Sequence, residues 1–316
     1  MRVAFLDDFH NAYEKTDGVA QLRQHADVCI FTEEIGGPSE LGGFDAIVAT
    51  RERTVFDREM LESLPDLKLL CQTGNHAYHI DMLAAEQLGI KVGKASGGFC
   101  GAAGELAIAL MMSSMRRIPH CDAALKAGEW PTPMTPVLRG KTLGIVGLGN
   151  IGKFVAGICK AFGMEVVAWG GRLTDTAAAE VGVRRVELDE LVAISDVISV
   201  HATLSPATRS LIDARHFALM KPTAHIINTA RGPIINEAAM IDALREKKIA
   251  GAGLDVFDTE PLPTDHPLRK LDNVVLTPHL GWPTDEMYAQ FADASLEILL
   301  AYKSGAEFPE FTSTHS

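Results

Sequence analysis

Short apolar runs alternate with segments of helical periodicity throughout this 316-residue chain, and that alternation restricts the possible folds more than any other feature. In the first hundred residues, helical spacing at 58–64 and 80–88 lies between apolar runs at Val3–Leu6, Val28–Phe31, Ala46–Thr50, Leu67–Cys71 and Ile90–Val92. Strands that alternate with helices pair in parallel, because each helix carries the chain back to the start of the next strand. The pattern therefore predicts an α/β unit with a small, doubly wound parallel sheet of flavodoxin-like type.

A second series of apolar runs begins at residue 143 and predicts a second doubly wound parallel sheet. Its members are Leu143–Val146, Val166–Trp169, Val197–His201, Ala224–Asn228, Gly251–Asp255 and Val274–Thr277. A long helical pattern at 99–117 lies between the two series. It is followed by Trp130–Pro136, where three prolines predict an irregular arm.

The last helical pattern, at 286–301, follows both series and is expected to pack back onto the first unit. The first domain is therefore expected to be discontinuous and to comprise residues 1–98 and 290–316. The second domain then comprises residues 99–289, with a helix and arm at 99–140.

A glycine-rich turn, Gly147-Leu148-Gly149-Asn150-Ile151-Gly152, lies between the predicted strand at 143–146 and a predicted helix at 151–162. Glycines at this spacing allow a tight turn, a close approach of the backbone to a pyrophosphate, and close packing of helix on strand. The helix N-terminus then offers N–H groups and partial positive charge to the phosphates. This context predicts a Rossmann dinucleotide-binding domain; a glycine-rich turn without a ligand is the alternative.

The next predicted strand, 166–169, ends in Gly170-Gly171-Arg172-Leu173-Thr174. An NAD-binding domain usually has a carboxylate here, which binds the ribose 2′-hydroxyl and repels a 2′-phosphate. Glycine removes that carboxylate, whereas the Arg172 guanidinium and the Thr174 hydroxyl suit a phosphate. We therefore predict that NADP is preferred over NAD, with contacts from Gly171, Arg172 and Thr174. In the alternative, Arg172 is only a surface charge and both cofactors are used.

Three polar residues follow three later strands of the second series. Arg231 follows 224–228, Glu260 follows 251–255 and His279 follows 274–277. Ligands bind outside the carboxyl ends of strands in open parallel sheets, so these side chains are expected to share one crevice with the dinucleotide. An arginine, a carboxylate and a histidine form a plausible set for moving a hydride and a proton. Taken singly, each could be a surface ion pair, a solvated turn residue or a structural hydrogen-bonding group.

Several segments resemble the signatures of the D-isomer-specific 2-hydroxyacid dehydrogenase family. They are GLGNIG (147–152), DVISVHATLSPATRSLI (196–212), NTARGP (228–233), GLDVFDTEPLP (253–263) and TPHLGW (277–282). The resemblance covers nearly the whole chain. It implies a cofactor domain inserted in the substrate domain, and a homodimer with the 99–117 helix and the arm near Trp130 at its interface.

The resemblance also implies roles for residues of both domains. Arg231 holds the carboxylate or carbonyl oxygen of a small 2-oxo acid, His279 supplies the proton, and Glu260 favours the protonated imidazole and orients it. Asp255 resembles the residue that meets the nicotinamide carboxamide. Further cofactor contacts are expected at His201, Ala202, Thr208, Ala230 and Gly281, and substrate contacts at Arg53, Thr73, Gly74 and Asn75. In the alternative, Arg53 forms a salt bridge at the domain interface and does not contact the substrate.

The resemblance leaves the substrate side chain and the direction of the reaction unassigned. Glyoxylate or hydroxypyruvate is the expected substrate class, and pocket shape is expected to depend on Phe99, Trp282, Tyr78 and Trp130. A phosphoglycerate-dehydrogenase-like enzyme and a dinucleotide-sensing, corepressor-type binding protein are the alternatives. The first of these usually carries a C-terminal regulatory domain, and the second an interaction segment; neither is expected in this chain. Formate oxidation is disfavoured, since the resemblance implies glutamine for that activity where this chain has Glu260.

The composition agrees with a globular enzyme that acts on small molecules. A formal net charge of −12 argues against nucleic acid or an anionic membrane as a partner. The five cysteines lack metal-site spacing, so no metal site is expected, and reduced thiols in a cytoplasmic protein are predicted.

Overall fold

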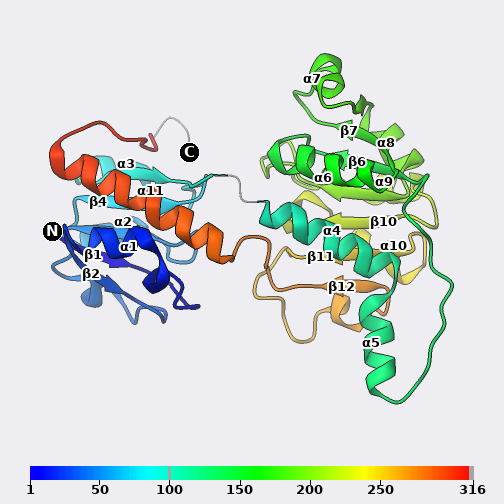
Figure 1. Cartoon of the computed structure of the whole chain (residues 1–316), viewed down its shortest axis with the longest axis horizontal. Coiled ribbons are helices and arrows are strands. Elements are labelled where there is room, and N and C mark those ends of the chain that lie inside the picture. Colours follow the sequence, from blue (N-terminus) through cyan, green and yellow to red (C-terminus); the bar gives the residue numbers. More distant parts are fainter. Residues whose placement is uncertain (99–100, 313–316) are drawn as a thin grey trace. The chain divides into compact units, whose positions relative to one another are not determined.

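The computed structural model describes residues 1–98 and 101–312 and divides the chain into two compact units. One unit comprises Met1–Cys100 and Pro283–Ser316, and the other comprises Gly101–Trp282 (Figure 1). The chain therefore returns to the first unit at Pro283, whereas the boundary expected from sequence, 289/290, falls inside helix α11 (Asp285–Ser304). The helix begins at Asp285, one residue before the predicted pattern at 286–301, and the Thr284 side chain caps it by accepting a hydrogen bond from the Met287 N–H at 3.2 Å.

The first unit is built on a five-stranded sheet with strand order β2-β1-β3-β4-β5. All its neighbouring strands pair in parallel, as the alternation of strands and helices predicts. Its strands are β1 (Arg2–Phe5), β2 (Asp27–Ile30), β3 (Ala46–Ala49), β4 (Leu69–Thr73) and β5 (Lys91–Ala95). Its helices are η1 (Tyr13–Lys15), α1 (Asp17–Leu22), η2 (Pro38–Leu41), α2 (Arg58–Glu62), α3 (Met82–Gln87) and α11.

Helix α11 completes the first unit although it comes from the far end of the chain. It lies beside α1 in Figure 1, and a Cβ added at Gly18 of α1 would come within 2.8 Å of the backbone of Ala292. On β5, a Cβ at Gly93 would meet the Ile298 side chain at 2.8 Å. Glycine at both positions lets the helix approach closely, which is the packing that the sequence analysis expected of the last helix.

The second unit is built on a seven-stranded parallel sheet with strand order β12-β11-β10-β9-β6-β7-β8. Its strands are β6 (Thr142–Val146), β7 (Glu165–Trp169), β8 (Arg184–Arg185), β9 (Val197–Val200), β10 (His225–Asn228), β11 (Gly251–Leu254) and β12 (Val274–Leu276). Its helices are α4 (Ala102–Met115), α5 (Ile118–Lys126), α6 (Asn150–Ala161), α7 (Asp175–Glu180), α8 (Leu188–Ile194), α9 (Ala214–Leu219), η3 (Gly232–Ile234), α10 (Glu237–Arg245) and η4 (Pro267–Lys270). The strand order reverses between β6 and β9, at the point where a doubly wound sheet binds its ligand.

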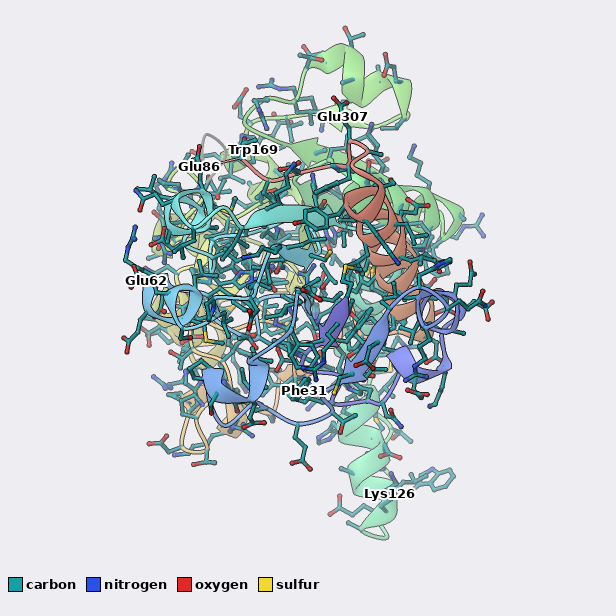
Figure 2. All side chains as sticks on the ribbon, turned by 90° about the vertical axis from the view of Figure 1, so that its left-hand side faces the viewer. Phe31, Glu62, Glu86, Lys126, Trp169 and Glu307 are labelled. Carbon is teal, nitrogen blue, oxygen red and sulfur yellow. The ribbon has the colours of Figure 1, made fainter. Side chains whose placement is uncertain are left out.

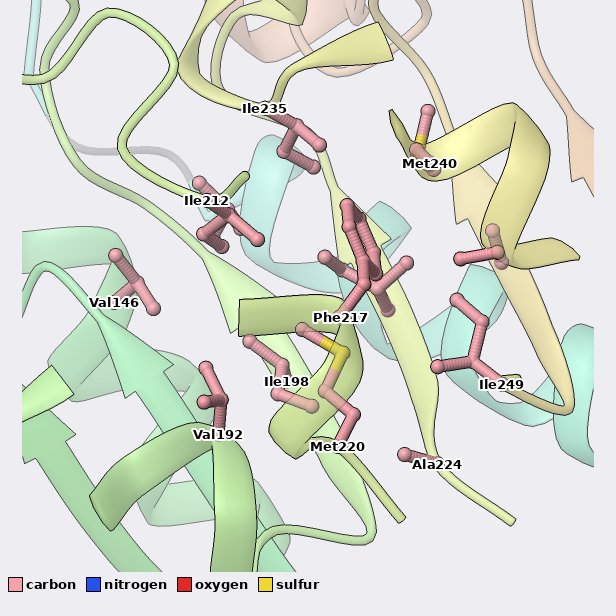
Figure 3. Packing of buried hydrophobic residues seen from close by; sticks show 14 of the residues in the cluster. Val146, Val192, Ile198, Ile212, Phe217, Met220, Ala224, Ile235, Met240 and Ile249 are labelled. Atoms are coloured by element: carbon pink, nitrogen blue, oxygen red, sulfur yellow. The ribbon is translucent and has the colours of Figure 1, made fainter. Parts of the chain in front are cut away.

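Helices cover both faces of this second sheet, so its strands are apolar on both sides. Val146 and Ile198 contribute to a core under α8, α9 and α10, where Phe217 and Met220 fill the space above the strands (Figure 3). Their sequence neighbours Ile145 and Val197 point to the opposite face, under α4 and α6. These continuous apolar runs are typical of buried parallel strands, and the predicted α/β class with two such sheets is confirmed.

Two elements of the second unit have no counterpart among the predicted elements. Strand β8 contains only two arginines, which lack the apolar run by which strands were identified. Helix α5 has no buried residue: its large apolar side chains, Ile118 and Leu125, are exposed, and its nine residues give only a short periodic signal. The segment after it, 129–137, has no regular structure, as its prolines predict. Among the described residues, no helix has the length and apolar character needed to cross a membrane.

Candidate active site

The glycine-rich turn follows β6 at the reversal of strand order, and each of its glycines has a distinct surrounding. Gly147 has φ +99, and a Cβ there would meet the backbone N of Ala202 at 2.6 Å. A Cβ at Gly152 would collide with the Gly147 carbonyl oxygen and meet Ile145 at 3.1 Å. At Gly149 nothing lies within 4 Å of an added Cβ. The turn is therefore tight at its first glycine, packed at its third and accessible at its second.

Helix α6 begins at this accessible position. Its N-cap residue is Gly149, and no side chain caps its first N–H groups. These groups and the positive end of the helix dipole face the turn; Leu148 lies in the turn, and Asn150 and Ile151 begin the helix. The residues present thus fit the pyrophosphate of a dinucleotide.

The loop after β7 presents cations and no buried carboxylate. Gly171 and Arg172 are exposed, and Arg172 has no hydrogen bond or ion pair within the described parts of the chain. Arg185 of β8 stabilises this loop, since its Nε donates to the Leu173 carbonyl oxygen at 3.0 Å. Thr174 caps α7 by accepting the Ala177 N–H at 3.2 Å. Asp175 begins that helix and is exposed.

Other residues expected near the cofactor lie at the same edge of the sheet. His201 and Ala202 follow β9 directly, and Ala202 packs against Gly147. Burial lowers the pKa of His201 to about 4, so its ring is neutral near pH 7; its Nε2 lies 2.8 Å from the Ser199 hydroxyl. The Thr208 hydroxyl donates to the Thr203 carbonyl oxygen at 2.7 Å and accepts the Ser205 N–H at 2.8 Å.

The carboxylate of Glu260 and the imidazole of His279 are in direct contact. Glu260 Oε2 lies 2.6 Å from His279 Nδ1, and Glu260 Oε1 accepts the Phe257 N–H at 2.9 Å. Burial opposes ionisation of Glu260, but the hydrogen bond and charge of His279, the Phe257 N–H and the charge of Arg231 outweigh it. The pKa of Glu260 is therefore held below its usual value, and the carboxylate stays ionised beside the ring.

A fully buried carboxylate, Asp255, holds the loop that carries His279. It accepts hydrogen bonds from the Thr277 hydroxyl at 2.6 Å, the Leu280 N–H at 2.7 Å and the Gly281 N–H at 2.9 Å. His279 has φ +55, and its own N–H donates to the Asp255 carbonyl oxygen at 2.9 Å. Sequence reasoning assigned Asp255 to the nicotinamide and missed this structural task.

The Arg231 loop is shaped by Asn228, a residue that sequence reasoning did not select. Asn228 is buried; its Oδ1 accepts the Ala230 N–H at 3.0 Å, and its Nδ2 donates to the Arg231 carbonyl oxygen at 3.0 Å. An asparagine that ends a strand and can close an Asx turn with the N–H two residues on was the available signal. A Cβ at Gly232 would collide with the Phe257 backbone, so the Arg231 loop packs tightly on the loop that leads to Glu260.

A second histidine–carboxylate pair holds the Glu260 loop from its other side. His266 Nε2 lies 3.1 Å from Glu237 Oε1, and Glu237 Oε2 accepts the Asp258 N–H at 3.4 Å. Arg269 adds hydrogen bonds to the carbonyl oxygens of Leu262 and Pro263, both at 2.8 Å. The sequence analysis did not assign these contacts.

The substrate residues expected in the first unit follow β3 and β4. Arg53 Nη1 donates to the Asp7 carbonyl oxygen at 2.5 Å, and its guanidinium lies 4.4 Å from the centre of the Phe9 ring. Thr73 Oγ1 accepts the Arg51 N–H at 2.8 Å. The Gly74 N–H donates to the Ala95 carbonyl oxygen at 3.3 Å, so the N–H groups available to a ligand begin at Asn75.

Four aromatic residues were expected to shape the pocket. Tyr78 is 68% exposed, Trp130 is 82% exposed and Trp282 is half-buried. Phe99 lies outside the described residues.

Comparison with known proteins gives one consistent result. Residues 108–281 match the profile of the D-isomer specific 2-hydroxyacid dehydrogenase, NAD binding domain. A glyoxylate reductase of Korarchaeum cryptofilum is 34% identical over 300 residues, which are 91% of this chain and 90% of the relative. A D-3-phosphoglycerate dehydrogenase of Archaeoglobus fulgidus is 42% identical over 249 residues, so the match spans 78% of this chain and 47% of that protein. The crystal structure of a phosphoglycerate oxidoreductase from Vibrio cholerae has a TM-score of 0.87 at 32% identity and covers 97% of this chain and 100% of its own.

The contact between Glu260 and His279 predicts how Glu260 titrates. In His279→Ala, burial of the carboxyl remains while the hydrogen bond and charge of the imidazole are lost, so the pKa of Glu260 should rise. Carbon-13 NMR of labelled glutamate side chains measures it. His120→Ala, an exposed histidine of α5, is the control and should leave the titration unchanged. A Glu260 pKa that does not move in His279→Ala would contradict the pairing.

Proposed function

The chain belongs to the D-isomer-specific 2-hydroxyacid dehydrogenase family, and from this premise we propose that it reduces small 2-oxo acids, such as glyoxylate or hydroxypyruvate, with a nicotinamide dinucleotide. The observation that carries the proposal is the 2.6 Å contact between Glu260 and His279 at the edge of a sheet that also bears the glycine-rich turn. The bound cofactor supplies the hydride. The residues of this chain bind the acid and deliver the proton.

His279 delivers the proton. Its Nδ1 is engaged by Glu260, which leaves Nε2 as the atom that gives a proton to the carbonyl oxygen of the substrate. The ionised Glu260 sets the orientation of the ring through this contact. General acid catalysis of this kind contributes roughly 10²- to 10⁴-fold to the rate.

Arg231 binds the carboxylate or carbonyl oxygen of the acid. Its planar guanidinium offers two parallel donors to two oxygens, which a lysine ammonium cannot reproduce. The Asx turn at Asn228 and the close packing of Gly232 hold its backbone beside the Glu260 loop. In the substrate unit, Arg53 and the N–H of Asn75 are the proposed contacts.

Two alternatives share much of this support. The phosphoglycerate dehydrogenase relative has the higher identity, although the chain spans about half of its length. The glyoxylate reductase relative matches over nine tenths of both chains, which favours the smaller acid. A corepressor-type protein that only senses the dinucleotide would bind cofactor without turnover.

NADP is the proposed cofactor, in preference to NAD. Two features support a 2′-phosphate at the end of β7. Arg172 is exposed and has no ion pair or hydrogen bond with any residue that the structure describes, and Gly170-Gly171 offers no carboxylate. Arg185 adds a second cation at this loop, and its charge is offset by Glu187 at 2.8 Å and Asp175 at 4.0 Å.

Assays of a 2-oxo acid panel with NADPH and NADH test the enzymatic proposal. Wild type should reduce glyoxylate or hydroxypyruvate, and His279→Ala should lower kcat/KM by roughly 10²-fold or more while cofactor still binds. Fluorescence titration of the cofactor provides the binding control. Binding without turnover of any 2-oxo acid would favour the sensing alternative, and near-normal turnover by His279→Ala would remove the histidine from the chemistry.

Arg172→Ala tests the cofactor preference. A charge-assisted hydrogen bond is worth about 1.5–3 kcal/mol, so KM for NADPH should rise roughly ten- to a hundredfold, with little change for NADH. Arg245→Ala, an exposed arginine of α10, serves as the control. Equal KM values for the two cofactors in wild type would refute the preference.

A homodimer is proposed, with α5 and the arm after it at the interface. Large apolar side chains are exposed there: Ile118, Leu125, Trp130, Met134 and Val137, of which Met134 is 99% exposed. Helix α5 projects from the sheet of its unit in Figure 1, with Lys126 near its tip in Figure 2. Five large apolar side chains exposed on one helix and the segment after it favour association. Light scattering should give twice the chain mass, and Trp130→Glu should lower it; a monomeric wild type would contradict the assembly.

A further inference from the structure

A buried polar relay joins the loops that follow β3 and β4 in the first unit. It consists of Arg51, Gln72, Thr73 and His79, and the side chains of Gln72, Thr73 and His79 are at most 8% exposed. Gln72 Nε2 donates to the Arg51 carbonyl oxygen at 2.9 Å and to the Thr73 carbonyl oxygen at 2.7 Å. The Arg51 N–H in turn donates to Thr73 Oγ1 at 2.8 Å. Two of these hydrogen bonds join the loops to each other, and the third orients the Thr73 carbonyl.

His79 completes the relay by donating a hydrogen bond from Nε2. Its Nε2 lies 3.0 Å from Gln72 Oε1. Two carbonyl oxygens face the Gln72 amide nitrogen, so the amide oxygen is the group that faces His79, and it can only accept. His79 Nε2 therefore carries a proton and donates. Burial, together with the charges of Arg51 and His76, lowers the pKa of His79, so the neutral ring persists near pH 7.

The two joined loops carry the substrate contacts proposed above. Arg53 lies two residues after Arg51, and Asn75 lies two residues after Thr73. Gly74, between them, has φ +91, and a Cβ there would collide with the Arg51 guanidinium. Its N–H is bound to Ala95, so the geometry of the next N–H, at Asn75, depends on how Gln72 orients the Thr73 carbonyl.

We propose that Gln72 and His79 are positioning residues for the substrate carboxylate, acting through the backbone of the 73–77 loop. Neither touches the acid. The relay sets the spacing between the two loops and aims the donor at Asn75. This inference rests on the proposed function, since it assigns the loop to a 2-oxo acid. The relay requires a hydrogen-bond donor at the position of His79 Nε2. An α/β sheet as such does not need a donor there.

Three variants at His79 test the relay. Leucine removes the donor, glutamine places an amide N–H near the position of Nε2, and asparagine places it near the position of Nδ1. Losing one buried hydrogen bond should raise KM for glyoxylate or hydroxypyruvate roughly five- to a hundredfold in His79→Leu and His79→Asn. His79→Gln should stay within a fewfold of wild type. KM for the cofactor should be unchanged in all three, because the glycine-rich turn belongs to the other unit.

Hydrogen–deuterium exchange gives a second readout that needs no turnover. Peptides covering 50–54 and 73–80 should exchange faster in His79→Leu than in His79→Gln, with the second unit unchanged. Gln72→Glu, which removes both amide donations, should reproduce the KM effect if His79→Leu does not fold. Wild-type KM in folded His79→Leu, or equal KM in the glutamine and asparagine variants, would overturn the relay. Failure of wild type to reduce any 2-oxo acid would instead overturn the proposed function, and with it the substrate role of these residues.

Discussion

The candidate site of the second unit depends on one buried charge, the carboxylate of Asp255. Three hydrogen bonds from the segment 277–281 converge on its two oxygens, and the N–H of His279 bonds to its backbone carbonyl oxygen. Burying a carboxylate is costly, and burial raises the pKa of Asp255 despite these donors. The donors can be supplied only if the chain after β12 turns back sharply, which places His279 in the left-handed region at φ +55.

Two carboxylates near the histidine thus have opposite properties. The partners of Asp255 are chiefly neutral N–H and O–H groups, and desolvation dominates its titration. Glu260 has the imidazole and the charge of Arg231 as partners, and these outweigh desolvation and lower its pKa. The first carboxylate therefore builds the loop, and the second remains ionised beside the ring. This separation of roles follows from their surroundings, since both are simple carboxylates on neighbouring loops.

Glycines are as important to the site as the residues that carry functional side chains. A Cβ at Gly147 would meet Ala202 of the adjacent loop, and a Cβ at Gly232 would collide with Phe257. Parallel pairing brings the carboxyl ends of strands to one edge, where several loops compete for little space. Glycine at these points lets the loops of the second unit pack closely. In the first unit, the hydrogen bonds of the polar relay around Gln72 hold the loops together.

The sequence by itself determined the α/β class, the two parallel sheets and the residues that end the strands. Apolar periodicity is a local property, and a residue that follows a strand must lie at the sheet edge, so Glu260 and His279 could be selected before their 2.6 Å contact was seen. Helix α5, the short strand β8 and the relay at His79 could not be predicted. Strand β8 has no apolar residue, α5 is short and buries none of its residues, and the relay joins buried polar groups from separate loops. Only tertiary structure decides such contacts, because a polar side chain takes whichever partner remains once burial has excluded water.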